Sequence, residues 1–132
     1  MSENVTFSTA AAKGFQGTNY DLVTVFDCLH DMGDPVGASK HVREALAPDG
    51  TWMIVEPFAN DEMKDNMNPV GRMYYSFSTL LCTPCSRSQE VGMCLGAQAG
   101  EKQVQKVVQS AGFSRFRRAT QTPFNLVYEA RP

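Results

Sequence analysis

The stretch YDLVTVFDCLHDMGDPVGASKHVREALAPDGTWMIVEP, residues 20–57, decides the fold. Its beginning, Tyr20–Phe26, is a nearly continuous apolar run rich in β-branched side chains. Such a run predicts a strand buried on both faces, as in a parallel sheet covered by helices. Residues 51–55 form a second apolar strand of the same kind. With a helix between them, the two strands make a βαβ unit whose crossover is right-handed.

The helix inside this unit carries start and stop signals. Asp34 can cap the free N–H groups of the first turn, and Pro35 suits the first helical position. The run Ala47-Pro48-Asp49-Gly50 then ends the helix, because proline cannot continue it and Asp-Gly favours a turn. The helix also has a narrow apolar stripe, made of Val42, Ala45 and Leu46.

Polar side chains gather where the two strands end. Asp27, His30 and Asp31 follow the first strand, and Glu56 follows the second. In open α/β sheets, ligands bind outside the carboxyl ends of the strands. We therefore expect any chemistry of this chain at that place.

Composition limits the class of protein. The 132 residues suit a single domain, and 42% hydrophobic with 20% charged residues is a globular composition. A net charge of -2 gives no electrostatic case for binding nucleic acid or an acidic membrane. No segment resembles a signal peptide or a membrane span, so a cytoplasmic location is expected.

The four cysteines include a C-x-x-C pair, Cys82 and Cys85. A zinc site of that kind needs a second ligand pair at close spacing, and the sequence has none. A redox site would place the pair at a strand-to-helix junction, whereas here it follows a helical pattern. We interpret these thiols as structural or incidental and predict no metal.

The remaining segments alternate between helix and strand signals. Residues 4–9 alternate weakly and predict a strand, and residues 59–68 predict a loop. Asn68-Pro69 starts a second helix on the same capping logic, and Pro84 ends it. That helix is amphipathic, with apolar residues at Val70, Met73, Tyr74, Phe77, Leu80 and Leu81.

The carboxyl-terminal third predicts a loop, a helix and a hairpin. Residues 86–100 predict a mobile loop with a short helical piece at 89–95, and residues 101–111 predict a helix closed by Gly112. Strands follow at 116–120 and 124–131, joined by a turn. The sheet is therefore expected to be mostly parallel with an antiparallel end, and to carry helices on both faces.

Three motifs, in this order, resemble the carboxyl-terminal half of a class I S-adenosylmethionine-dependent methyltransferase. Residues 20–32 resemble the family's fourth strand and the loop after it, and residues 46–56 its next turn and strand. Ala111-Gly112-Phe113 and the two strands after it resemble the closing helix and hairpin. The resemblance covers most of the chain and implies a partial Rossmann-like sheet in a single domain, residues 1–132.

The segment Leu29-His30-Asp31-Met32 also resembles the Leu-His-Asp-Trp segment of small-molecule O-methyltransferases. The resemblance implies that His30 is the general base that deprotonates an acceptor hydroxyl, and that Glu56 orients it. A histidine with a pKa near ~6.5 can take such a proton at neutral pH. The alternative is that His30 caps the strand end and Glu56 is a solvated strand terminus. By the same resemblance, three side chains would contact the acceptor: Asp31, Tyr74 and Phe77.

The family's cofactor-binding elements are largely absent. The glycine-rich turn and the acidic residue that hold S-adenosylmethionine have no counterpart here, and the usual aspartate near adenine is replaced by residues 10–12, all alanine. The resemblance leaves Phe26 and Asp27 at the methionine end and Ala11 and Ala12 at the adenine end. We therefore expect weak or absent cofactor binding by this chain.

Two functional hypotheses follow. The first is a methyltransferase, present as a truncated, partial or split chain acting on a small-molecule acceptor. The second is a non-enzymatic module with a methyltransferase-like fold that dimerises or regulates. Without the family's first strands, the strand at 21–26 is an exposed apolar edge, which invites pairing with another chain. We expect a homodimer, formed by that edge or by exchange of residues 4–15.

Overall fold

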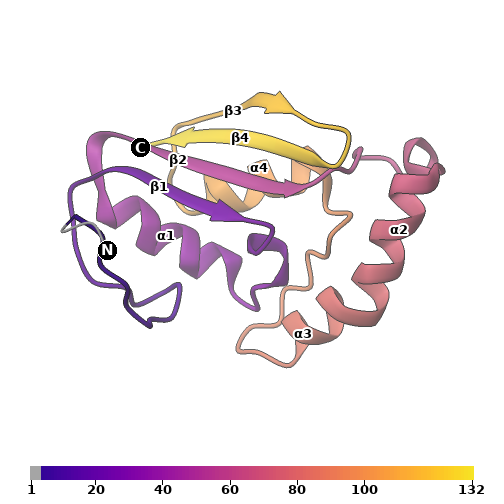
Figure 1. The fold of residues 1–132 in the computed structure, drawn as a ribbon, viewed down its shortest axis with the longest axis horizontal. Helices are drawn as coiled ribbons and strands as arrows, with labels where there is room; N and C mark the ends of the chain where they lie inside the picture. The colour runs from indigo at the N-terminus through magenta and orange to yellow at the C-terminus, as the bar shows by residue number, and fades with distance from the viewer. Residues whose placement is uncertain (1–3) are drawn as a thin grey trace.

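The computed structural model describes residues 4–132, which form one mixed four-stranded sheet with helices (Figure 1). The strands are β1 (Tyr20–Phe26), β2 (Leu46–Pro57), β3 (Arg115–Gln121) and β4 (Asn125–Arg131), in the order β1-β2-β4-β3. β1 runs parallel to β2, whereas β4 runs antiparallel to both β2 and β3. The α/β class and the antiparallel hairpin are confirmed, while the parallel part of this sheet is a single pair of strands.

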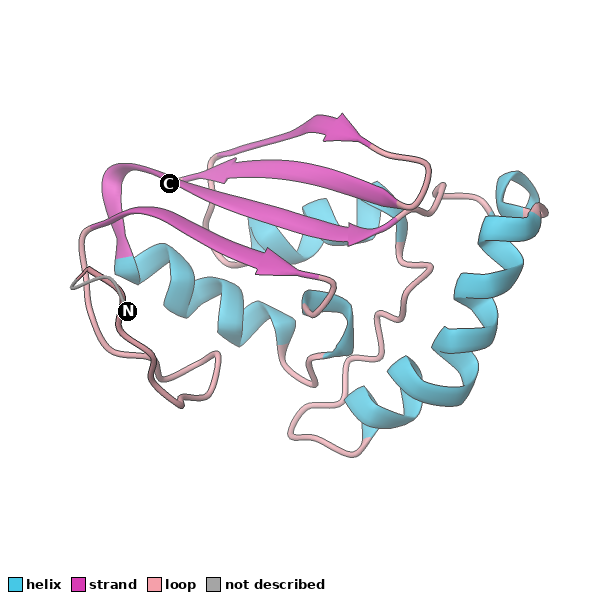
Figure 2. Ribbon diagram, in the orientation of Figure 1, coloured by secondary structure: helices cyan, strands magenta, loops and turns pink. Residues whose placement is uncertain are grey.

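Two helices pack on one face of the sheet (Figure 2). They are α1 (Pro35–Ala45) and α4 (Gly100–Ser110), which contact each other as well as the strands. On β2, Trp52 and Ile54 face these helices and are fully buried, whereas Met53 and Val55 face the other way and are only half-buried. The prediction of helices on both faces is therefore not met by the described residues.

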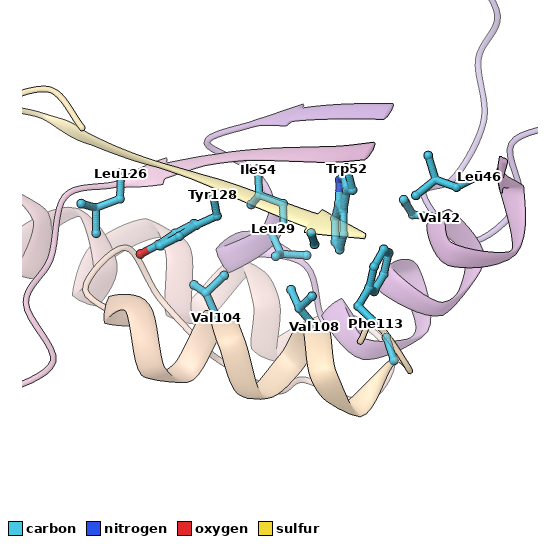
Figure 3. Close-up of a cluster of buried hydrophobic side chains, with 12 residues drawn as sticks. Leu29, Val42, Leu46, Trp52, Ile54, Val104, Val108, Phe113, Leu126 and Tyr128 are labelled. Carbon is cyan, nitrogen blue, oxygen red and sulfur yellow. The ribbon is translucent and has the colours of Figure 1, made fainter. Parts of the chain in front are cut away.

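The core lies between the sheet and these two helices (Figure 3). Trp52, at the centre, packs its ring 5.3 Å from that of Phe113, which follows α4. β4 adds every second residue to the same face, as a half-covered strand must. The other buried members of the cluster come from β2, β4, the two helices and the adjoining turns: Leu29, Val42, Leu46, Ile54, Val104, Val108, Ala111, Leu126, Tyr128 and Ala130.

The βαβ unit forms as predicted, with one difference at its turn. Asp34 caps α1 by accepting a hydrogen bond from the Gly37 N–H at 2.8 Å. The residues expected to form a separate turn, 47–50, are instead part of β2, which begins at Leu46. They are accommodated by a shift in register, because Tyr20 pairs with Leu46 but Leu22 pairs with Thr51.

β1 is an exposed edge strand. Leu22 is 55% and Phe26 60% exposed, so the burial on both faces predicted from the apolar run is wrong for the described chain, whereas the exposed edge expected from the resemblance is confirmed. The physical reason is that one edge of β1 has no strand beside it within residues 4–132 and one of its faces has no helix. The strand predicted at 4–9 is also wrong: these residues are irregular and exposed, since a weakly alternating segment needs a partner to form a ladder.

A helical arm extends beyond the carboxyl ends of β1 and β2 (Figure 1). It follows a short turn, η2 (Met63–Asn66), and consists of α2 (Pro69–Phe77), η3 (Ser78–Cys82) and α3 (Thr83–Arg87). The predicted end at Pro84 is wrong. η3 is a π-helical turn that directly precedes the proline-containing helix. In it the Thr83 N–H donates a hydrogen bond to the carbonyl of Ser78, five residues earlier. Pro84 then sits in the first turn of α3, where its missing N–H is tolerated.

The helical arm buries its small residues and exposes most of its apolar ones. Its predicted apolar stripe is largely exposed, with Phe77 52%, Leu80 81% and Leu81 61% accessible. The buried positions are small residues on the opposite side: Gly71, Ser78, Cys82 and Ser86. Gly71 packs directly on the Asn66 carbonyl and leaves no room for a Cβ. Close approach of backbones, rather than apolar burial, therefore fixes this side of the arm.

The segment from 88 to 99 is a loop without the helical piece predicted at 89–95. It is held to the end of β1 by backbone hydrogen bonds from Met93 to Gly33 at 2.9 Å and from Gly96 to His30 at 3.3 Å. α4 ends as predicted at Gly112, whose φ of +94° suits glycine. None of the helices within residues 4–132 is both long and apolar enough to cross a membrane.

Candidate active site

His30 and Glu56 meet at the carboxyl ends of β1 and β2. His30 lies in η1 (Leu29–Asp31), directly after β1, and Glu56 is the penultimate residue of β2. Both are buried, at 5% and 3% exposure, and His30 Nδ1 lies 2.6 Å from Glu56 Oε2. The second carboxylate oxygen, Oε1, accepts the Leu29 N–H at 2.9 Å. The sequence-based alternative of a solvated Glu56 is therefore wrong.

The pair has a defined electrostatic character. Burial alone would lower the pKa of His30, but the hydrogen bond to Glu56 and the surrounding carboxylate charges outweigh it, so the pKa lies above its ordinary value. A carboxylate can only accept, so it holds the proton of the neutral imidazole on Nδ1. The Nε2 lone pair is then free to accept a proton or bind a Lewis acid.

Asp31 lies on the Nε2 side of His30, and Cys82 lies close to both residues. Asp31 Oδ1 is 3.3 Å from Nε2, and the Asp31 side chain is 35% exposed, compared with 6% for His30. Cys82, in η3, is 4% exposed. Burial, together with the Asp31 carboxylate, raises the pKa of the Cys82 thiol to about 11. The arm thus contacts η1 with a protonated thiol.

A second polar group surrounds Asp27, which follows β1 with a φ of +46°. The Asn125 side chain donates to Asp27 Oδ1 at 2.8 Å. Tyr74, on α2, donates to the Phe124 carbonyl at 2.6 Å, and burial together with the Asp27 charge raises its pKa. Tyr74 therefore lies at the strand ends, whereas Phe77 ends α2 with half of its surface exposed.

The residues assigned to the cofactor by resemblance are not gathered in one place. Ala12 lines a hollow of about 420 Å³ along β1 and α1, with Phe15 and residues 22–25. Ala11 and Ala12 also line a smaller hollow of about 210 Å³ beside Asp34. Phe26 lines neither hollow and is exposed on the uncovered face of the sheet.

Two residues of the site were missed by sequence reasoning. Asn125 begins β4, and the antiparallel pairing of β4 with β2 brings it opposite Pro57, at the functional end of the sheet. A polar residue at the start of that strand was the available signal. Cys82 was considered only as half of a C-x-x-C pair. No local signal connects it to His30, because a π-helical turn sets which side of the arm faces η1.

The strand order and the parallel β1–β2 pair give a mixed α/β fold, with the buried histidine–carboxylate pair at the strand ends. No protein-family model matches the chain, and no curated protein matches it either. Solved structures of O-methyltransferases do match. At identities below 25% this likeness shows the fold.

Three solved structures illustrate it. Human N-acetylserotonin methyltransferase in complex with S-adenosylmethionine is 17% identical, with a TM-score of 0.66 over 99% of this chain and 34% of that chain. An O-methyltransferase family protein from Burkholderia thailandensis is 22% identical, with a TM-score of 0.63 over 95% and 35%. TnmH is 19% identical, with a TM-score of 0.71 over 96% and 35%. The chain spans about a third of the length of each of these proteins.

The described residues do not by themselves fit S-adenosylmethionine. Its ribose hydroxyls and amino-acid end need several polar partners. The hollow along β1 is lined mainly by apolar side chains, and the Asp27 carboxylate already accepts a hydrogen bond from Asn125. These residues therefore offer only part of a binding surface for the cofactor.

Proposed function

We propose that this chain supplies the acid–base part of a methyltransferase site that acts on a hydroxyl group of a small-molecule acceptor. One observation carries the proposal: the 2.6 Å hydrogen bond between buried His30 Nδ1 and Glu56. A buried carboxylate that already binds the Leu29 N–H keeps the imidazole in one orientation and one tautomer. This is the arrangement of a base with a positioning residue behind it.

In this proposal the two residues have separate roles. His30 Nε2 accepts the proton of the acceptor hydroxyl as the oxygen becomes nucleophilic. Glu56 stabilises the resulting imidazolium without taking the proton, because the charge-assisted bond is strongest when histidine is charged. Asp31 is the partly exposed group beside Nε2 and would contact the acceptor, with Tyr74 at the far side of the strand ends.

The cofactor is the second requirement, and the chain alone is expected to bind it poorly. Each polar group of a ligand left unmatched costs roughly 1–3 kcal/mol, and each 1.4 kcal/mol is about tenfold in affinity. Losing several partners moves a micromolar site to millimolar or weaker. The missing contacts would come from protein lying along the exposed edge and face of β1.

Three measurements test the proposal. Nitrogen-15 NMR of the imidazole should show the neutral Nδ1–H tautomer for His30, and an Nε2–H tautomer would contradict the base assignment. Isothermal titration with S-adenosylmethionine and S-adenosylhomocysteine should show millimolar or undetectable binding. Micromolar binding would contradict the partial site. Methyl transfer, where it is detected, should be lost in His30→Ala and kept in His41→Ala, since His41, on α1, hydrogen-bonds to the Phe15 carbonyl and packs against the Phe15 ring.

A non-enzymatic dimerising module is the second candidate. The observation that favours it is the exposed edge of β1, with Leu22 and Phe26 more than half accessible. A chain that dimerises through this edge and shows no methyl transfer under any pairing would support this candidate over the first.

A further inference from the structure

Three potential metal ligands from two distant segments meet beside the His30–Glu56 pair. His30, Asp31 and Cys82 each place one donor atom within 4.8 Å of the other two. His30 and Cys82 are at least 95% buried. Asp31 Oδ1 is also buried, and His30 Nε2 lies 3.3 Å from it without forming a hydrogen bond among the described residues. A buried carboxylate oxygen, an imidazole nitrogen and a thiol therefore converge, and one bound cation would satisfy all three.

We propose that His30, Asp31 and Cys82 bind a zinc ion, with a fourth coordination position open. The donor set is one nitrogen, one oxygen and one sulfur, which suits the borderline-soft character of Zn²⁺ better than that of Mg²⁺ or Ca²⁺. Three protein ligands with an open fourth position are typical of reactive rather than purely structural zinc sites.

The spacing of the donor atoms is compatible with one shared zinc ion. Bonds of about 2.0–2.3 Å to zinc place neighbouring ligand atoms roughly 3.3–3.8 Å apart. Nε2 of His30 and Oδ1 of Asp31 are 3.3 Å apart and fit directly. Because all three donor atoms lie within 4.8 Å of one another, the Cys82 sulfur needs to move by no more than about 1 Å to reach these separations. Cys82 lies on a π-helical turn and not in the sheet.

Glu56 supplies the support that a ligating histidine needs. Metal-binding histidines usually donate their second N–H to a carboxylate or carbonyl, which fixes the tautomer and orients the ring. Here Nδ1 is bound to Glu56 at 2.6 Å, so Nε2 is the nitrogen that faces Asp31 and Cys82. Binding would also displace the Cys82 thiol proton to the buffer, since the thiolate is the ligand.

The inference goes beyond the proposed function and does not rest on it. Zinc would occupy the Nε2 lone pair that the base needs, so a bound ion would block proton acceptance. It would also link η1 to η3 and fasten the helical arm to the sheet. Zinc should therefore raise the unfolding temperature, which is a readout independent of activity.

Cobalt titration of the purified chain tests the site, because Co²⁺ replaces Zn²⁺ and a thiolate ligand gives a near-ultraviolet charge-transfer band. We expect one equivalent of cobalt to produce the band and zinc to displace it. Cys82→Ser should abolish the band, whereas Cys85→Ser, the exposed member of the C-x-x-C pair, should keep it. Glu56→Gln should lower zinc affinity by about 10–100-fold, as loss of a supporting hydrogen bond does.

Opposite results would overturn the proposal. Absence of the band at millimolar cobalt would do so, as would a band that survives Cys82→Ser or disappears in Cys85→Ser. Should Cys82→Ser fail to fold by circular dichroism, Asp31→Asn carries the test, since Asp31 is partly exposed. It should weaken zinc binding at least tenfold, and an unchanged affinity would refute the site.

Discussion

Replacing Glu56 with glutamine should destabilise the fold by an amount that depends on pH. The carboxylate of Glu56 makes two buried hydrogen bonds, to His30 Nδ1 at 2.6 Å and to the Leu29 N–H at 2.9 Å. Glutamine has nearly the same shape and can still accept from Leu29. A hydrogen bond to a charged group contributes about 1.5–3 kcal/mol, against about 0.5–1.5 for a neutral one. Over two bonds the substitution should cost roughly 2–3 kcal/mol at mildly acid pH.

The sign of the pH dependence follows from His30. Its pKa is raised in the folded protein, so the folded state binds the proton more tightly than the unfolded chain does. This stability is fully present below the unfolded value, about 6.5, and is lost as pH rises through the folded value. The cost of Glu56→Gln should therefore shrink at higher pH, by about 1.4 kcal/mol for each unit of the upward shift that glutamine removes.

Urea unfolding at several pH values, from below 6.5 upward, measures this cost. The matched control is Glu44→Gln, which removes the same charge from an exposed position of α1. It should change stability by less than about 0.5 kcal/mol at every pH. A Glu56→Gln cost that stays constant with pH, or that grows as pH rises, would refute the assignment of His30 as the raised-pKa partner of Glu56.

Two further predictions concern the frame of the site. Asp34→Ala should lower the free energy of unfolding by about 1 kcal/mol, because it removes the cap of α1. The Gly37 N–H and then Lys13 lower the pKa of Asp34, so this contribution should fade as pH falls through the folded pKa. A urea midpoint unchanged relative to Glu44→Ala would contradict this prediction. We propose that the chain forms a homodimer through the edge of β1. In light scattering, Leu22→Lys should convert the dimer to a monomer, whereas Leu80→Lys, on the helical arm, should leave the dimer intact. A wild-type monomer at high micromolar concentration, or the reverse effect of the two variants, would contradict this prediction.

The parts of the fold that could be predicted are those in which local chemistry and tertiary structure agree. Tyr20–Phe26, the Asp34-Pro35 helix start and the stop at Gly112 each carry a signal within a few residues, and each forms as expected. The pairing of His30 with Glu56 could also be anticipated. The carboxyl ends of adjacent parallel strands must meet, whatever the details of their loops.

The errors have a different physical origin. Burial of β1 and a strand at 4–9 were inferred from local patterns of apolar residues, but burial depends on which neighbours are present, and residues 4–132 place none on that edge of β1. The helical arm differs for another reason. Its apolar stripe is largely exposed, whereas the small residues Gly71 and Ser78 are buried, because they allow the backbone to approach closely. The π-helical turn that carries Cys82 to His30 depends on this packing and has no sequence signature.

The two uses proposed for His30 compete for a single lone pair. Glu56 commits Nδ1 as a donor in both, so only Nε2 remains, and it cannot hold zinc and accept a proton at once. A change at Cys82 can distinguish zinc binding from proton acceptance. Cys82 lies on the helical arm and, among the described residues, forms no hydrogen bond to Glu56 or to β2. Cys82→Ser should therefore remove the metal while keeping the Nδ1–H tautomer of His30. A variant that loses both would mean that the thiol positions the imidazole itself, and the site would then have to be understood as one unit of four side chains.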